Sequence, residues 1–261
     1  LLPFQELGPL GLQFSPDGNY LYYLRTDPED PTRESLFQIP SVGGPPRKRI
    51  YDVAGSPAQV ARTGGSALTV SPDGKRICFH RTSLTPQGTP NSSLVIYDLE
   101  IHKERTLATV EAPESFSSPS WSPDGKRIAA ALLTPTQPLV SHLEMIDVET
   151  GRRVPVGPSV DWWIFGLTWL PDGRTIAIAA GSRVYMYTQI WTLSLSGDRL
   201  RRVTGDWASY VSGLGGLSVS ADGTRLVTPR SEETYNLWMV EASAGAQSRQ
   251  LTYGTSGASQ V

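Results

Sequence analysis

The sequence has few of the residues on which catalytic and metal sites are usually built. Its 261 residues include a single cysteine and three histidines. Cys78 stands within an apolar run, so we expect a small core residue that has no disulfide partner in the chain. His80, His102 and His142 lack the spacing of metal ligands, and we expect them at strand ends or in turns. The sequence therefore predicts no metal site and no cofactor.

Neither the net charge of the chain nor the length of its apolar runs indicates binding to nucleic acid or to a membrane. The chain has 23 basic and 25 acidic residues and a net charge of −2. This balance gives no electrostatic attraction to nucleic acid or to anionic lipid. No run approaches the roughly 18 apolar residues that a membrane-spanning helix needs, and no signal peptide is recognisable. We expect no nucleic-acid partner and no membrane contact by this segment.

The sequence also lacks the short motifs of two enzyme classes. A serine hydrolase needs a Gly-x-Ser-x-Gly nucleophile elbow, and residues 254–258 (Gly-Thr-Ser-Gly-Ala) have the second glycine one place too early. The glycine-rich loop, His-Arg-Asp and Asp-Phe-Gly motifs of protein kinases are missing too. We predict that this segment is not an enzyme, although a parent protein could carry a kinase or hydrolase domain elsewhere.

A short motif centred on Asp-Gly occurs five times along the chain. The steps between successive aspartates are 56, 51, 48 and 50 residues. A repeat near 50 residues is typical of propellers and solenoids. The ten motif residues are Asp17, Gly18, Asp73, Gly74, Asp124, Gly125, Asp172, Gly173, Asp222 and Gly223.

The residues around each Asp-Gly pair predict a hairpin turn. Proline before the aspartate presets the backbone angle of a type I turn, and the preceding serine accepts a local hydrogen bond. Glycine then adopts a left-handed conformation, which gives a three-residue hairpin with a bulge. Calcium binding is the alternative, but no copy has a second carboxylate two residues away. We interpret the repeat as structural.

Each turn is flanked by sequences that predict four strands. Apolar and polar residues alternate before it, a short apolar run follows it, and two further short strands close the unit. Four strands in about 50 residues form the blade of an all-β propeller. We predict five four-stranded antiparallel blades in a segment of a six- to eight-bladed propeller, since both chain ends look cut from a longer array. The blades span approximately 8–54, 64–110, 117–157, 164–206 and 214–254.

Particular residues carry a resemblance to known repeats. Residues 121–128 (Trp-Ser-Pro-Asp-Gly-Lys-Arg-Ile) resemble the WD-like repeat of TolB and its relatives, and the likeness extends over essentially the whole chain. The stretches 14–20, 36–44 with 46–48, 104–108 and 122–126 are similar to the C-terminal propellers of bacterial, acidobacterial-type, membrane-anchored Ser/Thr protein kinases. The first resemblance implies a periplasmic scaffold for peptides or lipoproteins. The second implies an extracytoplasmic sensor domain.

The predicted topology indicates where a ligand would bind. The Asp-Gly turns and the third-to-fourth-strand turns share one face, and the blade connectors share the other, which we call the connector face. Aromatic residues on loops are typical binding anchors. The alternative is that these side chains wedge between adjacent blades. The candidate residues on the connector face are Trp162, Trp163, Phe165, Trp207 and Tyr210.

Three functions are consistent with the sequence. The first is a non-catalytic recognition propeller, outside the cytoplasm, that binds a protein, peptide or small ligand. The second is an N-terminal gating propeller of a prolyl-oligopeptidase-like hydrolase. The third is a purely architectural spacer. The sequence does not identify the ligand, because a fold by itself does not define a function.

Overall fold

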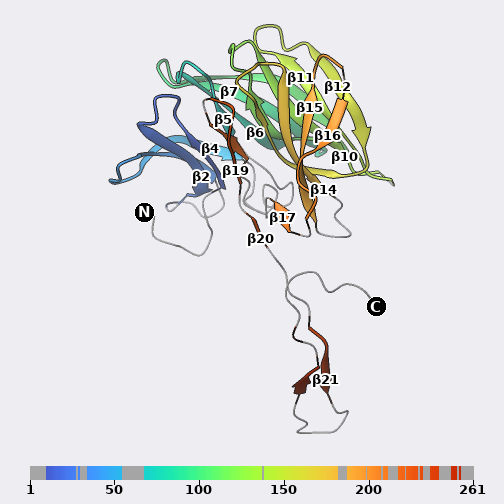
Figure 1. The fold of residues 1–261 in the computed structure, drawn as a ribbon. Helices are drawn as coiled ribbons and strands as arrows, with labels where there is room; N and C mark the ends of the chain where they lie inside the picture. The colour runs from blue at the N-terminus through green and yellow to red at the C-terminus, as the bar shows by residue number, and fades with distance from the viewer. Residues whose placement is uncertain are drawn as a thin grey trace.

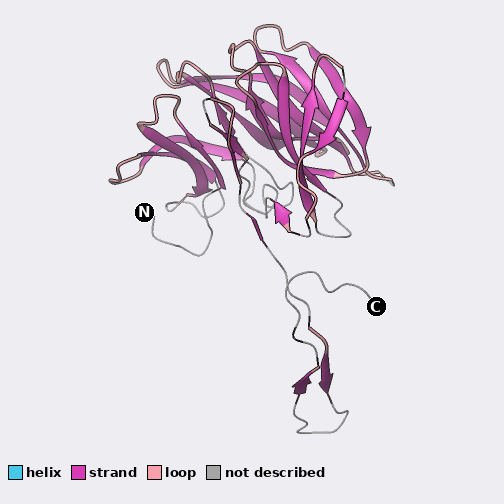
Figure 2. Cartoon of the chain, in the orientation of Figure 1, coloured by secondary structure: helices cyan, strands magenta, loops and turns pink. Residues whose placement is uncertain are grey.

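The structure is a computed structural model in which every assigned element is a β-strand (Figure 2). No helix long and apolar enough to cross a bilayer occurs among the residues it describes. It describes residues 10–27, 29, 34–54, 68–136, 138–181, 187–197, 199–206, 208–210, 217–220, 222–228, 230–231, 236–240, 248–251 and 253.

Sixteen consecutive strands form four antiparallel sheets of four strands each, and each sheet is one blade. Within a blade the strands pair in chain order, as the sequence predicts. Blade 1 contains β1 (Leu10–Phe14), β2 (Tyr20–Thr26), β3 (Glu34–Pro40) and β4 (Arg47–Ala54). Blade 2 contains β5 (Leu68–Val70), β6 (Arg76–Leu84), β7 (Pro90–Asp98) and β8 (Lys103–Glu111). Blade 3 contains β9 (Ser115–Trp121), β10 (Arg127–Thr134), β11 (Val140–Asp147) and β12 (Arg153–Val160). Blade 4 contains β13 (Trp163–Trp169), β14 (Thr175–Gly181), β15 (Thr188–Ser194) and β16 (Arg199–Arg202).

The fifth repeat forms shorter pairs of strands. Two pairs belong to its first half, and a third pair lies apart from them in Figure 1. In this last hairpin the Trp238 side chain is 56% exposed, whereas Ile96 and Ile146, in the third strands of blades 2 and 3, are at most 3% exposed. The pairs are β17 (Ser209–Tyr210) with β20 (Arg230–Ser231), β18 (Ser218–Val219) with β19 (Leu226–Val227), and β21 (Trp238–Val240) with β22 (Ser248–Gln250).

The first strand of each blade is the innermost one. β1 lies beside β5, β5 beside β9, β9 beside β13, and β13 beside β18, so the sheets radiate from a common axis (Figure 1). The fold is therefore the predicted antiparallel propeller. The connection between β6 and β7 is short, since the two strands pair as far as Leu84 and Pro90.

The five Asp-Gly turns have the predicted geometry. Each glycine has a φ between +63° and +72° and donates its N–H to the carbonyl three residues earlier, at 2.8–3.1 Å. In the four copies with serine, the hydroxyl donates to the aspartate at 2.5–2.6 Å. In the fourth copy leucine replaces serine, and Thr175 donates to Asp172 instead, from its N–H and its hydroxyl. The Ser220 hydroxyl and the Thr224 N–H lower the pKa of Asp222 to about 2. The aspartates are thus occupied in building turns.

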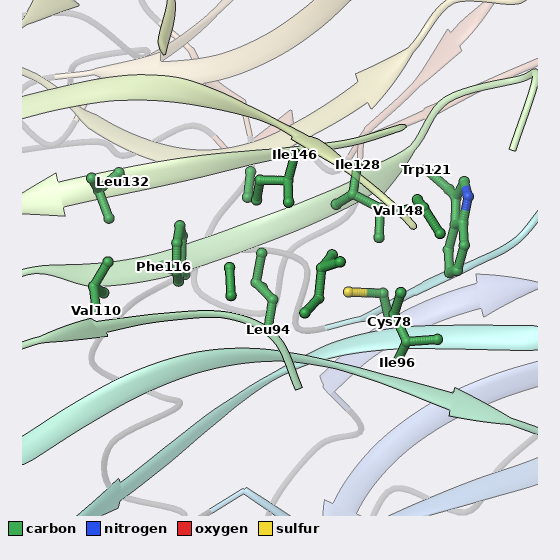
Figure 3. Close-up of a cluster of buried hydrophobic side chains, with 13 residues drawn as sticks. Cys78, Leu94, Ile96, Val110, Phe116, Trp121, Ile128, Leu132, Ile146 and Val148 are labelled. Carbon is green, nitrogen blue, oxygen red and sulfur yellow. The ribbon is translucent and has the colours of Figure 1, made fainter. Parts of the chain in front are cut away.

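Alternating side chains make both faces of a blade apolar. In blade 2, Ile77 and Phe79 pack toward blade 1, while Cys78 packs toward blade 3 with Leu94 and Ile96. Figure 3 shows this second cluster, in which Phe116 and Ile128 of blade 3 meet Leu94 across the gap between the sheets. Cys78 is fully buried, which confirms it as a core residue. The core is therefore a series of seams between blades.

The left-handed turn glycines give a direct test of the turn assignment. Gly173 has φ +63° and no atom within 4 Å of where a Cβ would lie, so the backbone angle alone penalises a side chain. We expect Gly173→Ala to lower the free energy of unfolding by about 1 kcal/mol in urea denaturation. Gly197→Ala is the control, because Gly197 is equally open and its φ is not left-handed. Equal effects of the two substitutions would contradict the assignment.

Candidate functional site

A cavity of about 290 Å³ lies at the axis, lined by the innermost strands. We call it the axial cavity. Its walls come from all five repeats, and most lining residues stand in the last positions before an Asp-Gly turn. The lining residues are Gln13, Thr69, Val70, Pro119, Ser120, Trp121, Pro123, Leu167, Thr168, Trp169, Pro171, Leu217, Val219 and Ser220.

The Asp-Gly turns surround this end of the axis. Pro123 and Pro171 of two turns line the cavity. Neighbouring turns also touch, since a Cβ on Gly223 would lie 3.2 Å from the Pro171 ring and one on Gly74 would lie 3.5 Å from Pro16. This end of the cavity is therefore lined in part by the Asp-Gly turns.

Hydrogen bonds between the innermost strands hold the cavity wall together. Thr69 Oγ1 in blade 2 accepts the backbone N–H of Trp121 in blade 3 at 3.2 Å. One blade further, Ser120 Oγ accepts the backbone N–H of Trp169 at 3.3 Å. The indole N–H of Trp169 also donates to the Ser120 carbonyl, at 3.2 Å. The same position in successive repeats thus links blade 2 to blade 3 and blade 3 to blade 4. These groups are buried, which makes the bonds costly to break.

Two arginines cover the tryptophan rings beside the cavity. The Arg76 guanidinium of blade 2 lies 5.1 Å from the Trp121 ring centroid, and that of Arg127 in blade 3 lies 5.2 Å from the Trp169 ring centroid. Both are cation–π contacts between neighbouring blades. They occupy ring faces that would otherwise be available for stacking, so the tryptophans (4–5% exposed) act as wall and not as open platforms.

The described lining of the cavity supplies hydrogen-bonding groups and a defined shape but no acid–base group. Its described lining consists of hydroxyl, amide, proline, aliphatic and indole side chains, none of them ionisable near neutral pH. A pocket of this kind suits a neutral ligand that hydrogen-bonds to several walls at once. Elsewhere, no group of three or more potential metal-ligating side chains is found within the described ranges.

The predicted aromatic residues divide between two seams. Trp162 packs against the cluster between blades 3 and 4, where its ring lies 4.7 Å from that of Trp191. Phe165 and Tyr210 pack against a different cluster, on the other face of blade 4. The Tyr210 hydroxyl donates to Asp206 at 2.7 Å. The described members therefore do not form one continuous surface, and the wedging alternative accounts for their packing.

The remaining two aromatic residues, Trp163 and Trp207, do not test the predicted binding role of the connector face. Trp163 is the half-buried first residue of β13, and Trp207 lies outside the described residues. A narrow apolar cavity of about 20 Å³ adjoins Trp162 and Trp191, and the Trp191 indole nitrogen is buried there without a hydrogen-bond partner in the described part of the chain. A binding role for the connector face stays a prediction.

The histidine positions differ in part from expectation. His102 lies in a turn, but His80 and His142 lie within β6 and β11. His80 is tolerated in a strand because it is buried and its Nε2 lies 2.9 Å from the Ser92 hydroxyl. The Ser92 hydroxyl oxygen also accepts the Phe116 N–H. His142 Nε2 lies 3.0 Å from Glu144 Oε1, within hydrogen-bond distance. Neither residue lies at the axis.

A signal for the axial cavity is present in the sequence beside each turn. Between the two apolar residues that precede each turn stands one small or polar residue, at the same distance from every Asp-Gly. In the first four repeats these residues line the cavity: Gln13, Thr69, Ser120 and Thr168.

Comparisons with known proteins locate the chain among propellers. No protein-family model matches it. It is 27% identical over 140 residues to dipeptidyl-peptidase 5 of Porphyromonas gingivalis, covering 51% of this chain and 20% of that protein. It is also 27% identical over 177 residues to an uncharacterized protein of Agrobacterium fabrum, covering 67% of this chain and 55% of that one. The chain thus spans a fifth and just over half of these two relatives.

Solved structures agree on the fold. A TolB-like protein from Agrobacterium tumefaciens superposes with a TM-score of 0.58 at 18% identity, covering 90% of this chain and 74% of that one. The chain has a TolB-like propeller fold. The GH74 enzyme of Niastella koreensis, with a TM-score of 0.60 at 12% identity, covers 85% of this propeller and 33% of its own chain. At such identities the likeness concerns the fold of the propeller and not its activity.

The indole hydrogen bond between blades 3 and 4 predicts a measurable loss of stability. Trp169→Phe removes the indole N–H and leaves the Ser120 carbonyl without that donor. We expect the free energy of unfolding to fall by about 1–3 kcal/mol in chemical denaturation. Trp238→Phe makes the same change at an exposed position and should alter it by less than about 0.5 kcal/mol. A neutral Trp169→Phe would show that this contact does not hold the wall.

His80 predicts a pH-dependent stability. Burial lowers the pKa of its imidazole from 6.5 to about 4. Between these values the unfolded chain binds a proton that the folded chain does not. The free energy of unfolding should therefore decrease as the pH falls from about 6.5 to about 4, by about 3 kcal/mol from this group.

The His80 slope is checked by denaturation at a series of pH values. His80→Gln should flatten the dependence over that interval relative to the wild type. An unaltered slope in His80→Gln would contradict the burial of a neutral imidazole.

Proposed function

We propose that this propeller segment is a non-catalytic recognition domain whose ligand occupies the axial cavity. The observation that carries the proposal is the convergence of equivalent hydroxyl and amide side chains from successive blades on one cavity of about 290 Å³. Repeated polar positions around an axis favour binding, because several weak hydrogen bonds then act on one ligand. The absence of ionisable groups from the described lining favours recognition over acid–base catalysis.

A second candidate site is the seam at Trp162 and Trp191 on the connector side. Both rings are half-buried, and the unpartnered indole nitrogen of Trp191 is a donor that a ligand carbonyl would satisfy. The adjoining cavity, about 20 Å³, is large enough for one water molecule or a methyl group. Its size favours the axial cavity as the main site.

The parent protein decides how such a recognition domain is used. The TolB-like fold supports an extracytoplasmic scaffold in the periplasm or at the cell surface. The similarity to dipeptidyl-peptidase 5 supports a propeller that precedes a hydrolase domain. The kinase-sensor hypothesis has the repeat resemblance as its only support. Reading the flanking coding sequence separates them: a kinase domain and membrane helix upstream, or a nucleophile elbow downstream.

The proposal is tested by blocking the cavity. Thr168 is half-buried and faces the cavity, so Thr168→Tyr fills the space with little disturbance of the seam bonds. Thr106→Tyr makes the same change on the exposed outer strand β8. Both proteins and the wild type are screened by thermal shift against neutral small molecules and capped peptides.

A ligand that raises the melting temperature of the wild type and Thr106→Tyr, but not of Thr168→Tyr, supports the axial site. Stabilisation that survives Thr168→Tyr and is lost in Trp162→Ala would instead assign the ligand to the connector side. A screen without any stabilising ligand would contradict the recognition function and favour an architectural role.

A further inference from the structure

The hydroxyl groups of the axial cavity are not chemically equivalent to free hydroxyls, because the neighbouring blade already uses part of their bonding capacity. A hydroxyl has one hydrogen to donate and two lone pairs that accept. Thr69 Oγ1 and Ser120 Oγ each accept a backbone N–H from the next blade, at 3.2 and 3.3 Å. Each therefore keeps its hydrogen, and no acceptor for that hydrogen is present in the described part of the chain.

Two further side chains add donors at the same level of the axis. Thr168 occupies the equivalent position in β13, and its hydroxyl makes no hydrogen bond within the described residues. Gln13 occupies it in β1, and its amide carries two N–H donors. Thr69 is 5% exposed and Ser120 is 7% exposed, so donors left unpaired there carry a desolvation cost. The cavity wall is consequently rich in donors that a bound group would satisfy.

The lining also restricts the charge of the bound group. No ionisable side chain belongs to the described lining, and the nearby guanidiniums of Arg76 and Arg127, which are not lining residues, lie over the two tryptophan rings. A carboxylate or phosphate in the cavity would lose hydration without gaining a directly paired cation, which is unfavourable. An amide carbonyl accepts the same hydrogen bonds at a much smaller desolvation cost.

We infer that the axial cavity binds the backbone carbonyls of an uncharged, extended peptide segment through the donors of Gln13, Thr69, Ser120 and Thr168. This inference rests on the proposed function and names the ligand class for that site. An extended chain directs successive carbonyls to opposite sides, and the four donors belong to different blades around one axis. Backbone recognition of this kind depends on main-chain hydrogen bonds and tolerates many side chains.

The test uses a capped glycine peptide, which has backbone carbonyls but neither charge nor side chains. Its binding to the whole chain is followed by the ¹H–¹⁵N indole signals of Trp121 and Trp169, both of which line the cavity and are assigned with Trp→Phe variants. Methylguanidinium, which only donates, is titrated as the opposite probe. We expect the peptide to shift both signals saturably and methylguanidinium to leave them unchanged.

Matched Thr→Val variants locate the hydrogen bond. Thr168→Val removes a hydroxyl that takes no part in the described seam bonds, and we expect a dissociation constant about fivefold weaker, as one hydrogen bond predicts. Thr106→Val, on the exposed outer strand, should bind as the wild type does. Folding of each variant is verified by the dispersion of the remaining amide signals.

Three outcomes would overturn the inference. Equal peptide affinity of Thr168→Val and the wild type would show that the Thr168 hydroxyl does not donate to the peptide. Tighter binding of methylguanidinium than of the peptide would show that the cavity wall accepts hydrogen bonds and does not donate them. A Thr168-dependent ligand that contains no carbonyl would refute the peptide class while leaving the axial recognition site intact. If no probe shifts the indole signals, and the thermal-shift screen finds no ligand whose stabilising effect is lost in Thr168→Tyr, both the peptide inference and the proposed function are wrong.

Discussion

Each blade of this protein has two apolar faces, and this constraint determines the rest of the structure. A half-buried antiparallel sheet alternates apolar and polar residues, but Ile77, Cys78 and Phe79 follow one another in one strand and are all fully buried. Such a sheet is stable only between two others, so blades must stack around an axis. The repeated Asp-Gly turn makes this possible because it reverses the chain in few residues and leaves the faces free.

Stacking around an axis brings equivalent positions of different repeats together, and the axial cavity is the result. Thr69 and Ser120 lie 51 residues apart and perform the same role, each accepting an N–H from the following blade. The bonds that link these blades thus use an acceptor site of each hydroxyl and leave its hydrogen available. Binding capacity here follows from the repeat itself and needs no added catalytic loop.

Much of this architecture could be predicted from the sequence, because turn chemistry and alternation are local. Gly125 and Gly173 were recognisable as left-handed turn residues, and Cys78 as a core residue. The site was harder to predict. Trp162 and Phe165 are close in sequence, yet they pack on opposite faces of blade 4. Trp162 precedes β13, and a register irregularity between Ile164 and Gly166 interrupts the alternation of that strand, so simple alternation along the sequence does not give their faces. Thr69 and Ser120 looked like ordinary polar strand residues, because their partners lie in another repeat.

The central claim is that hydrogen bonds between innermost strands hold the blades and form the cavity wall. Native-state hydrogen exchange of the backbone amides of Trp121 and Trp169 tests it most directly. The account predicts that both amides exchange only through global unfolding, and that Thr69→Val selectively accelerates Trp121 while leaving Trp169 protected. Rapid exchange of both amides in the wild type, at the rate of the exposed turns, would contradict it.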